Sequence, residues 1–247
     1  MWTKAFLSVG LCGAIQIASA AQLHPVEYQV VRWNKFAFHS VSVDLTSEQV
    51  SPAVIHSPRL ESIWSLVKED TPTVAVTGTF FHPTSASPVG DIVVEGKQTA
   101  EGYRGSVVAV DWFGDVKIFD SAFDQAIDWS PYRFALRGTV RIIRNGVVSP
   151  DPKSQQFRDP RVWSSAERCA VGTTKDGRLV IFATNNAVTL SELGKAMLSA
   201  GVHDAVNMDG GTSAAMLYKG DLKVRPGRKL SNLFVVYERS PFLLPSD

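Results

Sequence analysis

The sequence has few cysteines and no excess of charge of either sign, and each shortage excludes a class of protein. Cysteine occurs only at Cys12 and Cys169 in 247 residues. Because Cys12 lies in an N-terminal segment that we expect to be removed, the remaining chain cannot form an intramolecular disulfide. The 25 basic and 24 acidic residues give a net charge of +1. A nucleic-acid-binding domain carries a basic patch or stripe, so we expect no nucleic-acid partner.

Metal-ligand motifs and long apolar runs are also missing. None of the five histidines stands at a metal-ligand spacing such as H-E-x-x-H. We therefore predict no metal site and no other cofactor. After residue 20, no stretch is as long and apolar as the roughly 20 residues that a membrane-spanning helix needs. The sequence thus predicts no membrane partner for the mature chain.

The N-terminus has the pattern of a secretory signal peptide. Lys4 supplies positive charge, residues 5–17 are mostly apolar or small, and Ala18-Ser19-Ala20 has the small-x-small pattern of a cleavage site. The main alternative is a membrane anchor, for which the apolar run is short. Lipidation of Cys12 is a weaker alternative, because the small residues that precede a lipidated cysteine are absent. We predict that residues 1–20 are a signal peptide and that the protein is secreted or periplasmic.

Residues 21–247 are expected to form one domain, since a chain of this length can bury a substantial core. We predict an α+β fold with a mixed, mostly antiparallel core of many short strands and at least two packed helices. Apolar and β-branched runs between turn residues mark the strands. The predicted strands cover residues 26–34, 36–45, 73–76, 92–94, 106–110, 116–119, 140–144, 147–148, 168–174, 178–184, 205–208, 214–218 and 232–237.

Local signals add detail to this outline. The period-two alternation of residues 36–45 slips near His39-Ser40, which we interpret as a β-bulge. Ser57-Pro58 predicts the start of a helix, and its buried stripe is formed by Leu60, Ile63, Trp64 and Val67. Thr189 and Glu192 have the spacing of a capping box at the start of a second helix, which Gly201 ends.

The polar, proline-containing stretch of residues 149–165 is longer than an ordinary connection and is therefore a candidate functional loop. Within it, Arg158-Asp159-Pro160-Arg161 places two arginines around a proline. This group either extends an anion-binding site or is a solvated, charged loop. Before it, Asn145-Gly146 predicts a tight hairpin turn.

The segment Asp209-Gly210-Gly211-Thr212-Ser213 is the most informative for chemistry. An apolar strand delivers a carboxylate to its end, and two glycines let the backbone turn with positive φ and approach a ligand closely. Consecutive N–H groups in such a turn can bind an anion, and the two hydroxyls add donors. The alternative is an ordinary tight turn in which Asp209 bonds its own backbone.

Several motifs follow one another in a fixed order around this segment. They are Gly78-Thr79-Phe80-Phe81, Pro88-Val89-Gly90, Arg168-Cys169-Ala170-Val171-Gly172, the helix start Thr189-Leu190-Ser191-Glu192-Leu193, and Asn207-Met208-Asp209-Gly210-Gly211-Thr212-Ser213. Together they resemble the phosphodiester glycosidase family over about residues 70–238. The chain departs from the family pattern at Thr77, where asparagine is usual, and more mildly at Cys169, Met208 and Thr212.

The resemblance implies an anionic phosphodiester substrate and a sugar that leaves through an oxocarbenium-like state. It makes Asp209 the catalytic acidic residue or the residue that orients a catalytic water. It implies that Arg168 grips the phosphate, because a planar guanidinium matches two phosphate oxygens; a surface salt bridge is the alternative. The other candidates for substrate or phosphate binding are Thr77, Gly78, His82, Asn207, Gly210, Gly211, Thr212 and Ser213.

Glycosidases usually use two carboxyl groups, and the sequence does not name the partner of Asp209. Asp91, Glu95 and Asp159 are candidates, and each is alternatively a solvated loop charge. Cys169 lies in a predicted apolar strand, so we expect a buried, inert thiol.

The resemblance therefore implies an exported hydrolase that cleaves a sugar-phosphodiester bond in a glycan, envelope polymer or exopolysaccharide. The alternative is a non-catalytic binder of anionic or phosphorylated glycan, in which the Asp-Gly-Gly turn is a recognition loop. The departure at Thr77 keeps this alternative open. In both cases the partner is a sugar phosphate or glycan. A hydrolase triad or G-x-S-x-G elbow is not found.

Overall fold

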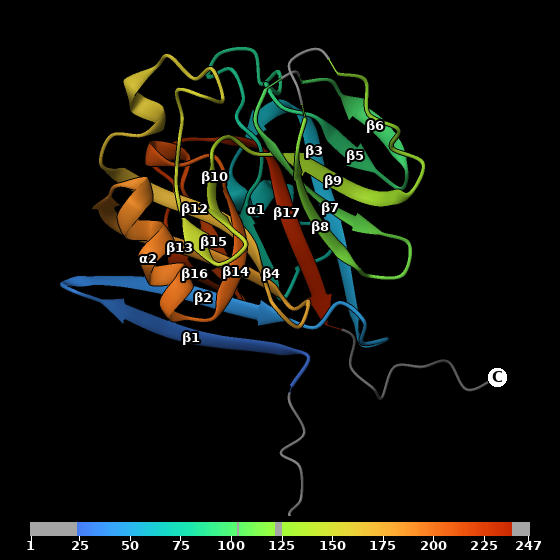
Figure 1. Cartoon of the computed structure of the whole chain (residues 1–247). Helices are drawn as coiled ribbons and strands as arrows, with labels where there is room; N and C mark the ends of the chain where they lie inside the picture. Colours follow the sequence, from blue (N-terminus) through green and yellow to red (C-terminus); the bar gives the residue numbers. More distant parts are fainter. Residues whose placement is uncertain (1–23, 103, 122–124, 239–247) are drawn as a thin grey trace, which may run out of the picture.

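The computed structural model describes residues 24–102, 104–121 and 125–238. The predicted signal peptide, residues 1–20, lies outside them. Within these ranges the chain forms three antiparallel sheets of seven, five and five strands (Figure 1). The expectation of a mostly antiparallel core of many short strands with at least two packed helices is confirmed, with strands predominating. The described chain is mostly β and has two α-helices.

The seven-stranded sheet has the order β1-β2-β13-β12-β14-β10-β11. Helix α2, Leu190–Ser199, packs on one of its faces, at the left in Figure 1. The strands are β1 Val26–Trp33, β2 Phe36–Val43, β10 Arg141–Arg144, β11 Val147–Val148, β12 Ala166–Thr174, β13 Leu179–Val188 and β14 Val202–Asn207.

The second sheet has the order β16-β15-β4-β17-β3, and the short helix α1, Ile63–Leu66, packs against it. Its strands are β3 Val50–Glu61, β4 Val74–Thr77, β15 Met216–Tyr218, β16 Asp221–Val224 and β17 Leu230–Glu238. The third sheet, at the upper right in Figure 1, has the order β6-β5-β9-β7-β8. Its strands are β5 Ile92–Val94, β6 Lys97–Ala100, β7 Ser106–Asp111, β8 Val116–Asp120 and β9 Tyr132–Arg137.

A shared hydrophobic core joins the three sheets. One cluster of buried side chains contains Val41 from the first sheet, Val76 from the second and Val108 from the third. A second cluster lies between α2 and the seven-stranded sheet. The sheets are therefore held against one another by continuous apolar packing, which fixes the loops at their ends.

The capping box is confirmed at the start of α2. The Thr189 hydroxyl accepts a hydrogen bond from the backbone N–H of Glu192 at 3.2 Å, and the Glu192 carboxylate accepts one from the backbone N–H of Thr189 at 2.8 Å. Gly201 follows the helix with φ of 85°, as the stop signal requires. None of the helices in the described ranges is both long and apolar enough to cross a bilayer.

The first predicted helix start is wrong. Helix α1 begins after Ser62, whose hydroxyl accepts a hydrogen bond from the backbone N–H of Ser65 at 3.1 Å. Residues 57 and 58 instead lie in β3, because β3 pairs with β17 as far as Glu61. The register is interrupted at residues 57–60, but the pairing of His56 and Glu61 on either side keeps this segment in the strand and outweighs the local helix signal. Ile63 and Val67 are buried as predicted, but Trp64 is 47% exposed.

The predicted β-bulge at His39-Ser40 is also wrong. The register of β2 with both β1 and β13 runs through these residues without a shift. The alternation of apolar and polar residues is interrupted in β2 because both faces of the sheet are covered. Phe38 packs in the cluster beneath α2, whereas Val41 packs in the central cluster on the opposite face. Residues on both faces of β2 are therefore buried.

Candidate active site

Three of the predicted motifs meet where strands from two sheets end. The backbone N–H of Met208 donates to the carbonyl of Cys169 at 2.9 Å, and that of Asp209 donates to the carbonyl of Gly78 at 3.0 Å. The Thr77 hydroxyl donates to the carbonyl of Ser213 at 2.6 Å. Segments that lie far apart in the sequence are thus tied together around the Asp209 turn.

A cavity of about 540 Å³ opens at this junction. The turn of residues 209–213 forms one side, and the predicted functional loop contributes Asp159, Arg161, Val162, Ser164 and Ser165. Its remaining lining residues are Phe80, Phe81, Pro83, Ala166, Arg168 and Arg228. The long loop therefore does reach the turn that carries Asp209.

Asp209 is the buried carboxyl group of this cavity. It is only 7% exposed, and its Oδ1 accepts a hydrogen bond from the backbone N–H of Gly210 at 2.9 Å. Burial raises the pKa of Asp209 to about 7, although a hydrogen bond from Ser213 and the charge of Arg228 oppose the shift. A carboxyl group with this pKa can hold or release a proton near neutral pH, which an acid–base catalyst requires.

The two glycines after Asp209 serve different purposes. Gly211 has φ of 57°, in the left-handed region that favours glycine. Gly210 has an extended backbone with φ of −142°, so the expectation of positive φ at both positions is wrong. Gly210 is needed for space, because a Cβ atom there would lie 2.7 Å from the carbonyl oxygen of Glu167. Both glycines and Thr212 line the cavity.

Arg168 lines the cavity as a fully buried cation, 1% exposed. Its guanidinium donates to the backbone carbonyls of Val162 at 3.0 Å, Val188 at 3.4 Å, and Ser164. Burial lowers the pKa of Arg168 to about 10. No described carboxylate lies within ion-pair distance of it. The alternative interpretation of Arg168, a surface salt bridge, is therefore wrong, whereas its role in phosphate binding stays a prediction.

Arg228 is the site residue that the sequence did not reveal. It lies between β16 and β17, lines the same cavity, and places its guanidinium carbon 4.8 Å from the centre of the Phe81 ring. The preceding Pro226-Gly227 indicates only a turn. Nothing in the local pattern shows which way the side chain of Arg228 points.

The other predicted residues have structural positions around the cavity. Thr77 is fully buried, and Asn207 donates to the Thr139 hydroxyl at 2.8 Å and to the carbonyl of Met208 at 2.9 Å. Gly78 is packed so closely that a Cβ atom would lie 2.3 Å from Oδ1 of Asn232. These three residues position the turn but do not line the cavity. His82 is exposed and lies outside the lining.

Of the three candidates for a second carboxyl group, only Asp159 lines the cavity. It forms an exposed ion pair with Arg161 at 2.6 Å, and hydrogen bonds from Arg161 lower the pKa of Asp159. Asp91 is buried in an ion pair with Arg137, and Glu95 forms a surface ion pair with Arg133. The structure thus separates Asp91 and Glu95 from Asp209.

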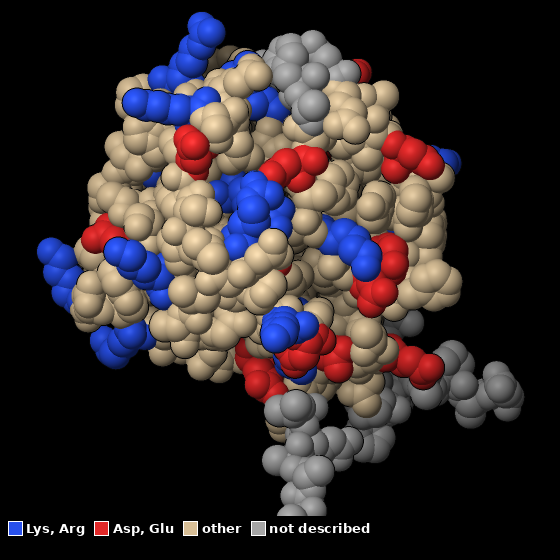
Figure 2. All heavy atoms as spheres, viewed as in Figure 1, with Lys and Arg blue, Asp and Glu red and all other residues tan. Residues whose placement is uncertain are grey.

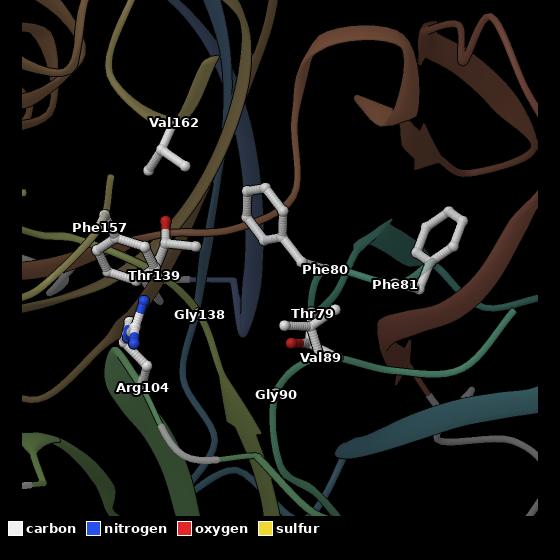
Figure 3. Close-up of a pocket in the computed structure, with 10 residues that line it drawn as sticks. All are labelled: Thr79, Phe80, Phe81, Val89, Gly90, Arg104, Gly138, Thr139, Phe157 and Val162. Atoms are coloured by element: carbon white, nitrogen blue, oxygen red, sulfur yellow. The ribbon is translucent and has the colours of Figure 1, made fainter. Parts of the chain in front are cut away.

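A smaller and more apolar cavity, of about 210 Å³, adjoins the first and shares Phe80, Phe81 and Val162 with it. Figure 3 shows Phe157, Thr139 and Val162 on one side of it, and Phe80, Thr79 and Val89 on the other. Most residues that line the smaller cavity are apolar, and Arg104 contributes a cation to it.

Charge elsewhere is dispersed. Figure 2 shows basic and acidic side chains interspersed on one face of the molecule. Within the described ranges, no three His, Cys, Asp or Glu side chains are grouped as metal ligands would be. The predicted absence of a metal and of other cofactors stays a prediction.

Known proteins resemble the chain both in sequence and in fold. The bovine N-acetylglucosamine-1-phosphodiester alpha-N-acetylglucosaminidase is 24% identical over 228 residues, which cover 81% of this chain and 43% of that protein. The human enzyme is 25% identical over 170 residues, covering 62% and 33%. The chain thus spans less than half the length of these relatives.

Two solved structures share the fold. The catalytic domain of the zebrafish enzyme of the same name, auto-inhibited by its pro-peptide, superposes with a TM-score of 0.73 and 19% identity, covering 89% of this chain and 86% of that one. A hypothetical protein from Synechocystis superposes with a TM-score of 0.65 and 14% identity, covering 89% and 65%.

The ordered motifs around Asp209 lie within one family match. The model of the phosphodiester glycosidase family matches residues 70–237, which include β4, the long loop, Arg168, the Asp209 turn and Arg228. This confirms the resemblance seen in the sequence: the chain belongs to the phosphodiester glycosidase family.

Proposed function

We propose that the protein is a hydrolase that cleaves the glycosidic bond of a sugar phosphodiester. One observation carries this proposal. The cavity combines a buried, protonatable carboxyl group, Asp209, with two arginines, Arg168 and Arg228, that form no ion pair with described residues. Asp159 and Arg161 neutralise each other. The cavity thus has an excess of positive charge, which suits an anionic substrate.

The raised pKa of Asp209 suits this substrate in a second way. An ionised carboxylate beside a phosphodiester would repel it, whereas a protonated carboxyl group can donate a hydrogen bond to a phosphate oxygen. In the proposed reaction, the bond between the sugar carbon and the phosphate oxygen breaks. Asp209 donates its proton to the departing oxygen and remains as a carboxylate beside the oxocarbenium-like sugar. Water then adds to the sugar and returns a proton to the site.

Other features of the site support further parts of the proposed reaction. Asp159 is the candidate second carboxyl group, since it alone of the three reaches the cavity. The adjoining cavity, which is mostly apolar but is also lined by Arg104, accepts a less polar part of the substrate. The relatives' names specify an N-acetylglucosamine phosphodiester for those proteins, and such compounds are the first substrates to test here.

We further propose that residues 21–247 form one exported domain that acts on a glycan, envelope polymer or exopolysaccharide in a secreted or periplasmic location. The support is the N-terminal pattern of Lys4, the apolar run and Ala18-Ser19-Ala20. The mass of the mature N-terminus tests it: we expect the chain to start at or close to Ala21. A mature fraction that retains Met1 would contradict export by cleavage.

The test of activity is a panel of sugar-1-phosphodiesters incubated with the mature protein. We expect release of free sugar together with the phosphate monoester. The Asp209→Asn variant should release these products far more slowly than the wild type. Release of sugar phosphate would mean that the other ester bond is cut, and would contradict the proposed reaction. Saturable binding without any release would favour the alternative, a non-catalytic binder of phosphorylated glycan.

A further inference from the structure

We propose that Arg228 is the residue that grips the anionic phosphate of the substrate, and that Arg168 is a positioning residue for the wall of the cavity. The inference rests on the proposed function for the identity of the anion. It concerns a residue that no sequence motif singled out. Three features of Arg228 support it: its placement, its uncommitted donors and its contrast with Arg168.

Arg228 is held beside the Asp209 turn by two contacts. The backbone N–H of Gly227 donates to the carbonyl of Thr212 at 2.8 Å, which ties the loop of Arg228 to the turn itself. The guanidinium then packs over the ring of Phe81, 4.8 Å from its centre. Both Thr212 and Phe81 line the cavity. A cation fixed in this way needs little reorganisation to bind an anion there.

The donors of Arg228 are uncommitted. Its side chain forms no hydrogen bond and no ion pair with the described residues, and its Nη2 is buried without an acceptor. A buried donor without an acceptor destabilises the protein, because it has lost its hydrogen bonds to water. An anion bound in the cavity would provide the missing acceptor, through a small rotation of the guanidinium. The planar group can then donate two parallel hydrogen bonds to a phosphate.

Arg168 differs in how its donors are used. Its guanidinium is directed to the carbonyls of Val162, Ser164 and Val188, so it joins the long loop to the end of β13. Two of these carbonyls belong to the loop that forms the cavity wall. Arg168 therefore contributes charge to the site, while its geometry is determined by the backbone around it.

Calorimetric titration with inorganic phosphate tests the assignment, using the mature protein and three variants. Arg228→Met keeps an unbranched side chain over Phe81 but removes the charge, and Arg228→Lys keeps the charge but not the planar fork. Arg225→Met is the matched control, because Arg225 is an exposed arginine of the same loop that does not line the cavity. Circular dichroism and thermal unfolding show whether each variant is folded.

We expect Arg228→Met to weaken phosphate binding by roughly tenfold or more, the scale of a hydrogen bond to a charged group. Arg228→Lys should weaken it less, and Arg225→Met should leave it within about twofold. If Arg228→Met does not fold, the phosphate affinities of Arg228→Lys and Arg225→Met are compared instead to test the assignment. Equal affinity in the wild type and the folded Arg228 variants, or equal losses in the Arg225 and Arg228 variants, would overturn the assignment.

The outcome is separable from that of the proposed function. A protein that binds phosphate through Arg228 but releases no sugar from any phosphodiester would defeat the hydrolase proposal and leave the assignment of Arg228 intact. Conversely, a wild-type protein that hydrolyses a phosphodiester while Arg228→Met retains its phosphate affinity would support the hydrolase and exclude Arg228 as the grip.

Discussion

The hydroxyl of Thr77 donates a 2.6 Å hydrogen bond to the backbone carbonyl of Ser213, and so joins the end of β4 to the turn that carries Asp209. Thr77 is the position at which the chain departs from the usual family asparagine. The contact gives the threonine a structural role at the site: it holds the turn in place, although Thr77 itself does not line the cavity.

Thr77→Val should therefore destabilise the protein through the turn. Valine has nearly the same shape but leaves the Ser213 carbonyl buried without its donor, at a cost of about 1–3 kcal/mol. Urea unfolding measures the change in the free energy of unfolding. Thr46→Val is the control, because the Thr46 hydroxyl makes an exposed local bond to Asp44 and its loss should cost under about 0.5 kcal/mol. Equal effects of the two substitutions would show that the Thr77 contact contributes nothing.

Cys169 should be unreactive in the folded protein. Its side chain is fully buried in β12, with Sγ 3.6 Å from the carbonyl of Ala215. Burial raises the pKa of Cys169 to about 12, so the reactive thiolate is scarce at neutral pH. A thiol reagent should label the mature protein rapidly in urea and slowly without it. Rapid labelling of the native protein would mean that the thiol faces the cavity rather than the core.

Local signals in the sequence predicted the parts of the molecule that local interactions determine. The capping box at Thr189 and Glu192 and the hairpin turn at Asn145-Gly146 formed as expected, since each depends on residues a few positions apart. Asp209 was likewise marked by its neighbours, an apolar strand before it and glycines after it.

Non-local contacts produced the parts that the sequence could not predict. Ser57-Pro58 gave a helix signal, but β3 pairs with β17 on either side of these residues, at His56 and Glu61, and the segment is part of the strand. Strand β9, the middle of the third sheet, was missed. Arg228 reaches the site because Gly227 is tied to Thr212, a contact between two turns that no pattern within either one indicates. Ordered family motifs therefore located the turn, whereas its charged surroundings required the structure.

Arg168→Lys should loosen the wall of the cavity. Lysine keeps the positive charge, but a single ammonium group cannot reach three carbonyls that a guanidinium spans. We expect the free energy of unfolding to fall by about 2–4 kcal/mol, and amide hydrogen exchange in residues 161–165 to become faster. Exchange mass spectrometry measures the second effect. Arg161→Lys in the same loop is the control, since Arg161 is 90% exposed; unchanged exchange in both variants would contradict the positioning role.

Asp209→Asn should abolish turnover while substrate binding persists. Asparagine keeps the size of the side chain and an oxygen that can accept from Gly210, so the turn should survive. It cannot donate the proton, and we expect kcat to fall by roughly 100-fold or more. In the wild type, kcat/KM should decrease as the pH rises above about 7, where Asp209 loses its proton. Near wild-type turnover in the folded variant would show that the catalytic group lies elsewhere.

The free energy of unfolding should depend on pH through the protonation of Asp209, and this can be measured without any substrate. The folded state holds the Asp209 proton up to a pKa of about 7, whereas the unfolded chain releases it near the ordinary value of 3.8. Between these values the folded state binds more protons, so the free energy of unfolding falls as the pH rises. A shift of this size corresponds to about 4 kcal/mol in total.

Asp209→Asn removes this penalty, so the variant should gain stability relative to the wild type as the pH is raised from 4 to 8. Urea unfolding at several pH values gives the difference. Asp159→Asn is the control, because Arg161 lowers the pKa of Asp159 below its ordinary value of 3.8. Asp159 is then ionised in both the folded and the unfolded state across most of this pH range, so the difference between this variant and the wild type should stay nearly constant. If the difference between wild type and Asp209→Asn does not change with pH, Asp209 is ionised in the folded state. It could not then be the proton donor of the reaction.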